Sequence, residues 1–292
     1  MPYNNPHIKG WLRVILIIIA YLFVGGVFYL LGALVAGVDF QKPLNQKTDL
    51  QNLIISSFDF LGTLSVIFLF LKVIDNESFS EIGLKITNRT KDILVGVLLG
   101  LVIMAFALLI LLYLEELEYE NINFEFENLI SIFLLFIIVS LKEEILVRGY
   151  VLRNFMYSFN KYIALILSSF LFSILHGLNP DFSFISFIDL FLAGIMLGLP
   201  YTFNKNLWFP IALHFSWNFF QSLFGFNVSG LDSYSLIEFS IPEPNLINGG
   251  GFGFEGSIIS IIVQVIVIVV MYVVYRRNQV LDTVQTSLKE SV

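Results

Sequence analysis

Apolar stretches long enough to cross a lipid bilayer recur along nearly the whole chain, with short polar segments between them. A transmembrane helix needs about 20 mostly apolar residues, so the pattern predicts about eight membrane-spanning helices. They lie near residues 11–37, 52–74, 92–114, 127–157, 160–178, 182–203, 207–224 and 256–276. No segment between them is long enough for a soluble domain. We therefore expect a single membrane domain, 1–292, of the all-α class, with a polar site inside the helix bundle.

Composition agrees with this polytopic architecture. Hydrophobic residues make up 57% of the chain and charged residues 13%, far from the balance of a soluble domain. The first apolar run is longer than the core of a secretory signal peptide, so we expect it to be retained as a helix. The high content of Ile, Phe and Asn favours a bacterial source. The chain is thus predicted to be an integral, multi-pass protein of the bacterial plasma membrane, with the lipid bilayer as a partner.

The positions of lysine and arginine predict the orientation in the membrane. Basic residues gather near both ends of the chain and in alternate connecting segments, which places both termini in the cytoplasm by the positive-inside rule. Two predicted outer loops are acidic, since 115–127 carries six Glu and 225–255 has no basic residue. The net charge of −7 gives no reason to expect nucleic-acid binding.

Several kinds of site are excluded or disfavoured by the residues present. The chain has no cysteine, which excludes disulfides, thiolate zinc sites and cysteine nucleophiles. The segment 251–256 formally reads GxGxxG, but no βαβ unit surrounds it, so we interpret it as part of an outer loop. There is also no GxSxG motif of the serine-hydrolase type.

Charged residues lie deep in the fourth predicted helix. At 3.6 residues per turn, Glu144 and Arg148 share a face and can pair, whereas Glu143 points about 100° away. The pairing lowers the cost of burying Glu144 and leaves Glu143 as the candidate general base. The plainer alternative is a charged helix end whose carboxylates reach the headgroups. Apolar residues continue beyond the charges, which disfavours that alternative.

Two later helices each carry a histidine with a partner residue one turn away. Phe172 and His176 are one turn apart, as are His214 and Asn218. Each pair alone is better explained as a structural contact between helices. Ionisable groups inside a bilayer are costly, however, and several of them on three helices indicate a catalytic centre. We therefore expect Glu143, His176, His214 and Asn218 to converge on one cavity.

In chain order the motifs read EExxxR, FxxxH and HxxxN, each on its own membrane helix. This ordered triple resembles the CAAX prenyl endopeptidase and bacteriocin-processing membrane protease family (CPBP, also called Abi), over roughly residues 127–224. The resemblance implies an intramembrane endopeptidase. In that family pattern Glu143, helped by His176, would activate the attacking water, and His214 with Asn218 would stabilise the tetrahedral oxyanion.

The resemblance also implies supporting roles for Glu144, Arg148 and Phe172. The substrate would be a peptide or a membrane-associated protein, cleaved in a cavity that we expect to open toward the cytoplasm. General peptide processing and bacteriocin immunity are both compatible with the motifs.

The need for a metal is a separate question, since the family has often been labelled metalloprotease. In a metallo-type site, Glu143, His176 and His214 would be the zinc ligands. No HExxH motif occurs, and a Glu-activated water with a His/Asn oxyanion site is complete without a metal. We therefore expect no cofactor, with zinc as the alternative.

Two other functions remain open at this point. A secondary transporter could use the same Glu and His residues as a proton relay, although the sequence shows no convincing internal symmetry. A non-enzymatic immunity or scaffold protein could keep them as structural groups. Asp59 and Asp189 also lie in apolar spans, and we interpret them as helix contacts or cavity-lining groups.

Overall fold

The computed structural model describes residues 8–39 and 47–290, and most of these residues are helical. The α-helices are α1 (Gly10–Val35), α2 (Asp49–Phe70), α3 (Thr90–Tyr113), α4 (Phe126–Glu144), α5 (Arg153–Ser158), α6 (Lys161–Leu175), α7 (Phe184–Asn204), α8 (Trp208–Leu223) and α9 (Ile258–Glu290). A π-helical turn, Ile145–Leu152, joins α4 to α5, so the described part of the chain forms eight continuous helical segments. This confirms the predicted polytopic all-α fold.

The helices differ in how well they suit a bilayer. Five are long and apolar enough to cross a membrane: α1, α2 with the π-helical turn Leu71–Asp75 that extends it, α3, α7, and α9 as far as Leu281. Large apolar side chains on the outside of the bundle, such as Phe23 of α1 and Leu109 of α3, are exposed, as expected for surfaces that contact lipid. Helix α6 is apolar but has only 15 residues, about 22 Å at 1.5 Å per residue.

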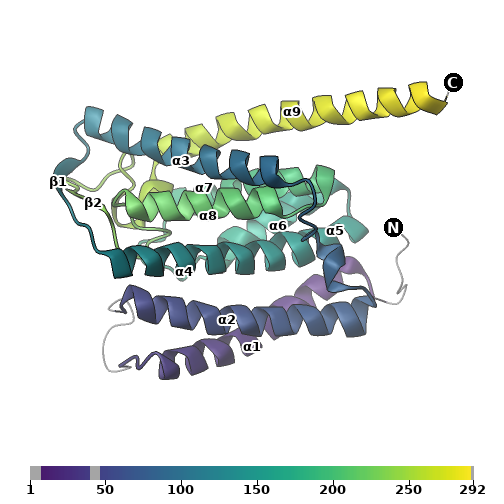
Figure 1. Cartoon of the computed structure of the whole chain (residues 1–292), viewed down its shortest axis with the longest axis horizontal. Coiled ribbons are helices and arrows are strands. Elements are labelled where there is room, and N and C mark those ends of the chain that lie inside the picture. The colour runs from purple at the N-terminus through teal and green to yellow at the C-terminus, as the bar shows by residue number, and fades with distance from the viewer. Residues whose placement is uncertain (1–7, 40–46, 291–292) are drawn as a thin grey trace.

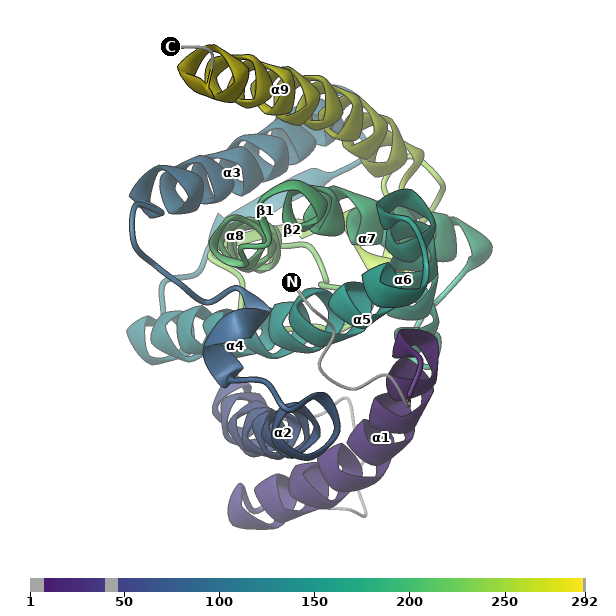
Figure 2. The ribbon, with the colours of Figure 1, turned by 90° about the vertical axis from the view of Figure 1, so that its right-hand side faces the viewer.

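The helices are arranged around α8. Figure 2 shows α8 near the centre, with α3, α4 and α7 around it and the α1–α2 hairpin on the far side of α4. Helix α9 packs mainly along α7. The first residues of α1 and the last residues of α9 lie at one end of the bundle, which we call the terminal end, and the two short strands lie at the other (Figure 1).

The strands were not predicted from the sequence. β1 (Glu118–Ile122) and β2 (Ile237–Ser240) form an antiparallel pair in which Glu118 faces Ser240, with an irregularity in register between Tyr119 and Asn121. One strand comes from each of the two acidic loops. The pair therefore ties these loops together at the end of the bundle opposite the terminal end. Strands of five and four residues carry too few alternating positions to stand out from a polar loop.

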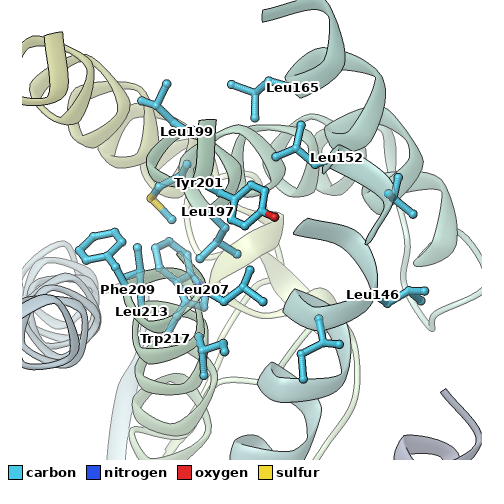
Figure 3. Close-up of a cluster of buried hydrophobic side chains, with 14 of the residues drawn as sticks. Leu146, Leu152, Leu165, Leu197, Leu199, Tyr201, Leu207, Phe209, Leu213 and Trp217 are labelled. Carbon is cyan, nitrogen blue, oxygen red and sulfur yellow. The ribbon is translucent and has the colours of Figure 1, made fainter. Parts of the chain in front are cut away.

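Close packing of α3 fixes the position of α8. A Cβ atom built on Gly100 would lie 2.8 Å from the backbone nitrogen of Trp217, so only glycine allows this approach. Around α8, buried apolar side chains of the π-turn, α6 and α7 complete the core, including Leu146, Leu165 and Leu197 (Figure 3). This core surrounds and supports the helix that carries His214 and Asn218.

A cluster of opposite charges holds the α1–α2 hairpin at the terminal end of the bundle. Arg13 of α1 pairs with Asp75 at the end of the π-turn after α2, and Arg153 of α5 pairs with Glu77. Both arginines are buried. We call these four residues the terminal-side ion-pair cluster. Because it joins α1 and the end of α2 to α5, it anchors the hairpin to the rest of the bundle.

Candidate active site

The candidate site is built on the point where α4 changes its helical type. Helix α4 ends at Glu144, and the following eight residues, Ile145–Leu152, form a fully buried π-helix. π-Helical turns are rare and frequently occur at functional sites. The sequence predicts a regular α-helix here, because no residue pattern distinguishes a π-helix from an α-helix.

Glu144 and Arg148 form the predicted ion pair across this change. Arg148 Nη1 lies 2.6 Å from Glu144 Oε1, and both side chains are buried. The same guanidinium donates through Nη2 to the carbonyl oxygen of Gly194 at 3.2 Å and lies 4.6 Å from the ring centroid of Phe172. Arg148 thus links the first motif to α7 and to the aromatic residue of the second motif.

Glu143 faces a different set of neighbours, as its position on the helix predicts. Its Oε2 atom lies 3.8 Å from Nε2 of His176 and 3.9 Å from Nε2 of His214. Among the described residues, these imidazoles are its only ion-pair partners, and Oε2 accepts no hydrogen bond. Glu143 is therefore the one carboxylate of the adjacent pair that has no lysine or arginine bound to it.

Each imidazole is oriented by a hydrogen bond through Nδ1. Nδ1 of His176 lies 2.8 Å from the carbonyl oxygen of Phe172, and Nδ1 of His214 lies 2.8 Å from Oε1 of Glu144. A carbonyl oxygen and a carboxylate oxygen only accept, so Nδ1 donates in both cases. Both rings consequently turn Nε2 toward Glu143. The Phe172 ring packs against His176, with centroids 4.7 Å apart, as the one-turn spacing predicts.

One cavity of about 660 Å³ contains these groups. It is lined by Glu143, His176, His214 and Asn218 together with Phe172, whereas Glu144 and Arg148 lie behind it. Asn218 is only 6% exposed, and its side-chain amide has no hydrogen-bond partner within the described ranges. The structure therefore brings the four predicted residues together. Their catalytic roles stay a prediction.

The mouth of the cavity lies at the end of the bundle opposite the terminal end. Its exposed lining residues are Pro180, Asp181, Leu231 and Asp232, which belong to loops at the end where the strands lie. The expectations that the cavity opens toward the cytoplasm and that both termini lie there therefore cannot both hold. Helix α6 is short and ends beside His176, so the loop after it reaches the cavity from the end opposite the terminal end.

The cavity also contains residues that the sequence did not predict to be at the site. Glu255 and Trp217 line the cavity, and Glu255 belongs to the glycine-rich segment interpreted only as an outer loop. That segment instead packs into the bundle, with Glu255 4% exposed. Lys142 also lines the cavity and pairs with Asp59 at 2.8 Å. This pair confirms Asp59 as a contact between helices. The signal in the sequence that could have indicated the pair is Lys142, a charged residue in an apolar span directly before Glu143.

The alternative of a zinc site can be judged from the arrangement of the His, Asp and Glu side chains. Among the described residues, no group of three or more His, Asp or Glu side chains is arranged to hold a metal ion. The predicted ligand atoms are Oε2 of Glu143 and Nε2 of His176 and His214, which lie 3.8 and 3.9 Å from that oxygen. These would be the ligands if a zinc ion drew them closer.

Comparison with known proteins adds a family assignment. Residues 125–220 match the family model described as "Type II CAAX prenyl endopeptidase Rce1-like". No curated protein and no solved structure matches the chain. The matched segment runs from α4 to α8 and includes all three motifs. Over this segment, about a third of the chain, the protein is similar to the Rce1-like type II CAAX prenyl endopeptidases.

Proposed function

We propose that this protein is a metal-independent intramembrane endopeptidase in which Glu143 activates a water molecule. The observation that carries the proposal is the convergence of Glu143 Oε2 with both Nε2 atoms in a cavity inside an apolar bundle. A carboxylate without a cationic side chain bound to it can accept a proton from water. His176, whose Nε2 faces Glu143 and is an acceptor in the neutral ring, supplies a further site for that proton.

The reaction follows from the donors and acceptors around the cavity. Water donates a proton to Glu143, and its oxygen attacks the carbonyl carbon of the peptide bond. The resulting oxyanion accepts hydrogen bonds from Nε2–H of His214 and from the amide of Asn218, which the structure leaves without a partner. The C–N bond then breaks, and the departing nitrogen takes the proton from Glu143, with His176 assisting the transfer.

Glu144 makes the donor role of His214 feasible. Because Nδ1 of His214 already donates to Glu144, the ring can donate at Nε2 only as an imidazolium. The Glu144 carboxylate, 2.8 Å from Nδ1, supplies the counter-charge for that imidazolium. Arg148 in turn holds Glu144 in place. We assign Glu144 and Arg148 to positioning rather than to contact with the substrate.

The substrates in this proposal are peptides or membrane-associated proteins. Their processing, or cleavage that confers immunity to a bacteriocin, are the two physiological roles that fit this chemistry. With both termini in the cytoplasm, as the basic residues indicate, the cavity mouth faces the outside of the cell. Substrates would then arrive from the acidic side of the molecule.

Oxygen-isotope labelling tests this function directly. The purified full-length protein in lipid nanodiscs is incubated with a mixed peptide library in water enriched in ¹⁸O, and products are analysed by mass spectrometry. Hydrolysis places one ¹⁸O atom in each new carboxyl group, and the Glu143→Gln variant should form labelled product at least about 100-fold more slowly. A folded wild-type protein that forms no labelled product, but carries protons or peptides across vesicle membranes, would support the transporter alternative.

A further inference from the structure

The cavity contains a buried carboxylate for which the proposed reaction gives no role. Glu255 lies in the short 3₁₀ turn Phe254–Gly256 and is 4% exposed. Its Oε1 atom accepts from Trp217 Nε1 at 3.2 Å. Its Oε2 atom accepts from the backbone nitrogen of Ser229 at 2.7 Å and from the Ser229 hydroxyl at 2.8 Å. These neutral donors fix the carboxylate in place but do not cancel its charge.

No cationic side chain neutralises Glu255 in the described part of the chain. Two lysines line the cavity, but Lys142 is paired with Asp59. Lys47 donates to the hydroxyl of Tyr29 at 3.1 Å, on the α1–α2 side of the cavity. A buried charge is costly unless an opposite charge accompanies it. The arrangement of Glu255 therefore favours a cation that the ligand itself brings.

The surroundings of Glu255 suit a cationic ligand in a second way. Trp217, which donates to Glu255, also lines the cavity. Indole is the best of the aromatic rings at attracting ammonium and guanidinium groups. A carboxylate beside an indole thus combines charge attraction with a cation–π contact.

Independent of charge, this part of the cavity is open to a ligand. Asn218 follows Trp217 in α8, is 6% exposed and lines the cavity, and its amide has no hydrogen-bond partner within the described ranges. Its amide therefore has donors and an acceptor available to a ligand in the cavity. Trp217 precedes Asn218 in α8, and Trp217, Glu255 and Asn218 line the same cavity, so the subsite and the proposed oxyanion site share it.

We propose that Glu255 and Trp217 form a specificity subsite for a lysine or arginine side chain of the peptide substrate, close to the cleaved bond. Asp181 and Asp232, exposed at the mouth, attract cationic peptides toward it. The inference rests on the proposed function and adds the substrate class, which is cationic peptides that enter from the acidic end of the bundle.

Matched peptides test the subsite. In a peptide that the protein cleaves, each residue flanking the cleaved bond is replaced in turn by Lys, Gln or Glu, and kcat/KM is measured for the protein in nanodiscs. At one flanking position, we expect Lys to exceed Gln by at least about ten-fold, with Glu lower still. Equal values for the three residues at every position would overturn the inference.

Two variants test whether Glu255 causes the preference for Lys over Gln peptides. Glu255→Gln should bring the ratio of Lys to Gln peptides close to one. Glu243→Gln removes a charge from an exposed residue of the same loop that does not line the cavity, and it should leave the ratio unchanged. If Glu255→Gln does not fold, Asp232→Asn at the mouth is the substitute. It should lower kcat/KM for the Lys peptide more than for the Gln peptide, and an equal effect on both would count against the inference.

A binding measurement separates this inference from the proposed function. Fluorescently labelled Lys, Gln and Glu peptides are titrated with the Glu143→Gln variant, which keeps the subsite. Tighter binding of the Lys peptide by a protein that hydrolyses no peptide would support the subsite and contradict the peptidase. Hydrolysis accompanied by equal Kd values for the three peptides would support the peptidase and overturn the subsite.

Discussion

Two groups of charged residues lie inside the same bundle, and their chemistry differs. In the terminal-side ion-pair cluster, each arginine is matched by one carboxylate, Arg13 by Asp75 and Arg153 by Glu77. None of these four residues lines the site cavity. At the candidate active site, Glu143 instead faces two imidazoles and no lysine or arginine, and it does line the cavity.

The difference shows how a structural charge can be distinguished from a functional one inside a membrane protein. Burial alone does not distinguish them, because both groups are largely buried. A matched pair offers little to a ligand, since each charge is already satisfied by its neighbour. A carboxylate that faces imidazoles across a cavity still has hydrogen-bonding capacity, which a water molecule, a proton or a substrate can satisfy.

Replacing one carboxylate in each group by its amide gives the largest contrast. Glu143→Gln should lower kcat/KM by roughly 10²–10⁴-fold with little change in stability, because it removes the base and keeps the shape. Asp75→Asn should cost about 3 kcal/mol of stability, because it leaves the buried Arg13 without its carboxylate. Peptide hydrolysis and thermal unfolding in the same detergent measure both effects.

In this first comparison, the activity per folded molecule of Asp75→Asn should match that of the wild type. A loss of activity in Asp75→Asn as large as that in Glu143→Gln would break the distinction between the two groups.

Glu144→Ala should behave like a variant of the ion-pair cluster although the residue lies beside the base. It strands Arg148 as an unpaired buried charge, which should cost about 3–5 kcal/mol of stability. It should also slow the reaction by removing the acceptor for Nδ1 of His214. Glu144→Gln, which keeps an oxygen acceptor, serves as the milder control. If Glu144→Ala were stable and inactive while Glu143→Gln stayed active, the two carboxylates would have the reverse roles.

Asn218→Ala should reduce kcat by roughly 10²–10³-fold and change KM little, because an oxyanion donor acts mainly in the transition state. Truncation of Phe215, the half-buried neighbour on α8 that does not line the cavity, is the control for effects on helix packing. An increase in KM with unchanged kcat would assign Asn218 to substrate binding instead.

Chelation is expected to have the smallest effect. Prolonged dialysis against a strong chelator should leave peptidase activity unchanged, and the purified protein should carry less than one zinc ion per chain. A hydrolytic zinc ion would need Glu143, His176 and His214 together as ligands, which would occupy the proposed base. Activity that is lost on chelation and returns with added zinc would recast the three residues as a metal site.

The fold was largely predictable from the sequence, because apolar runs report directly on membrane helices. Each predicted span corresponds to a helical segment with bounds within a few residues, except that α9 continues beyond the predicted end at 276 to Glu290. The convergence of Glu143, His176 and His214 was also predictable, since burial in a bilayer is too costly for unpartnered polar groups. The pairing of Glu144 with Arg148 followed from their spacing of one turn.

Other features depend on contacts between distant segments, which local patterns do not encode. The π-turn Ile145–Leu152 has the same apolar composition as an α-helix. The bonding of Glu255 to Trp217 joins segments 38 residues apart. The end of the bundle at which the cavity opens also follows from such contacts, because it depends on where α6 ends relative to its neighbours.

The shortness of α6 has a consequence for the surrounding lipid. The hydrocarbon core of a bilayer is about 30 Å thick, whereas α6 spans about 22 Å. Leu178, just beyond its end, is fully exposed and is suited to contact acyl chains. The bilayer next to His176 must therefore thin, or the helix end must lie below the headgroups, which is a hydrophobic mismatch located at the active site. Acyl-chain length would then regulate this protein, and hydrolysis in vesicles of graded thickness would report it.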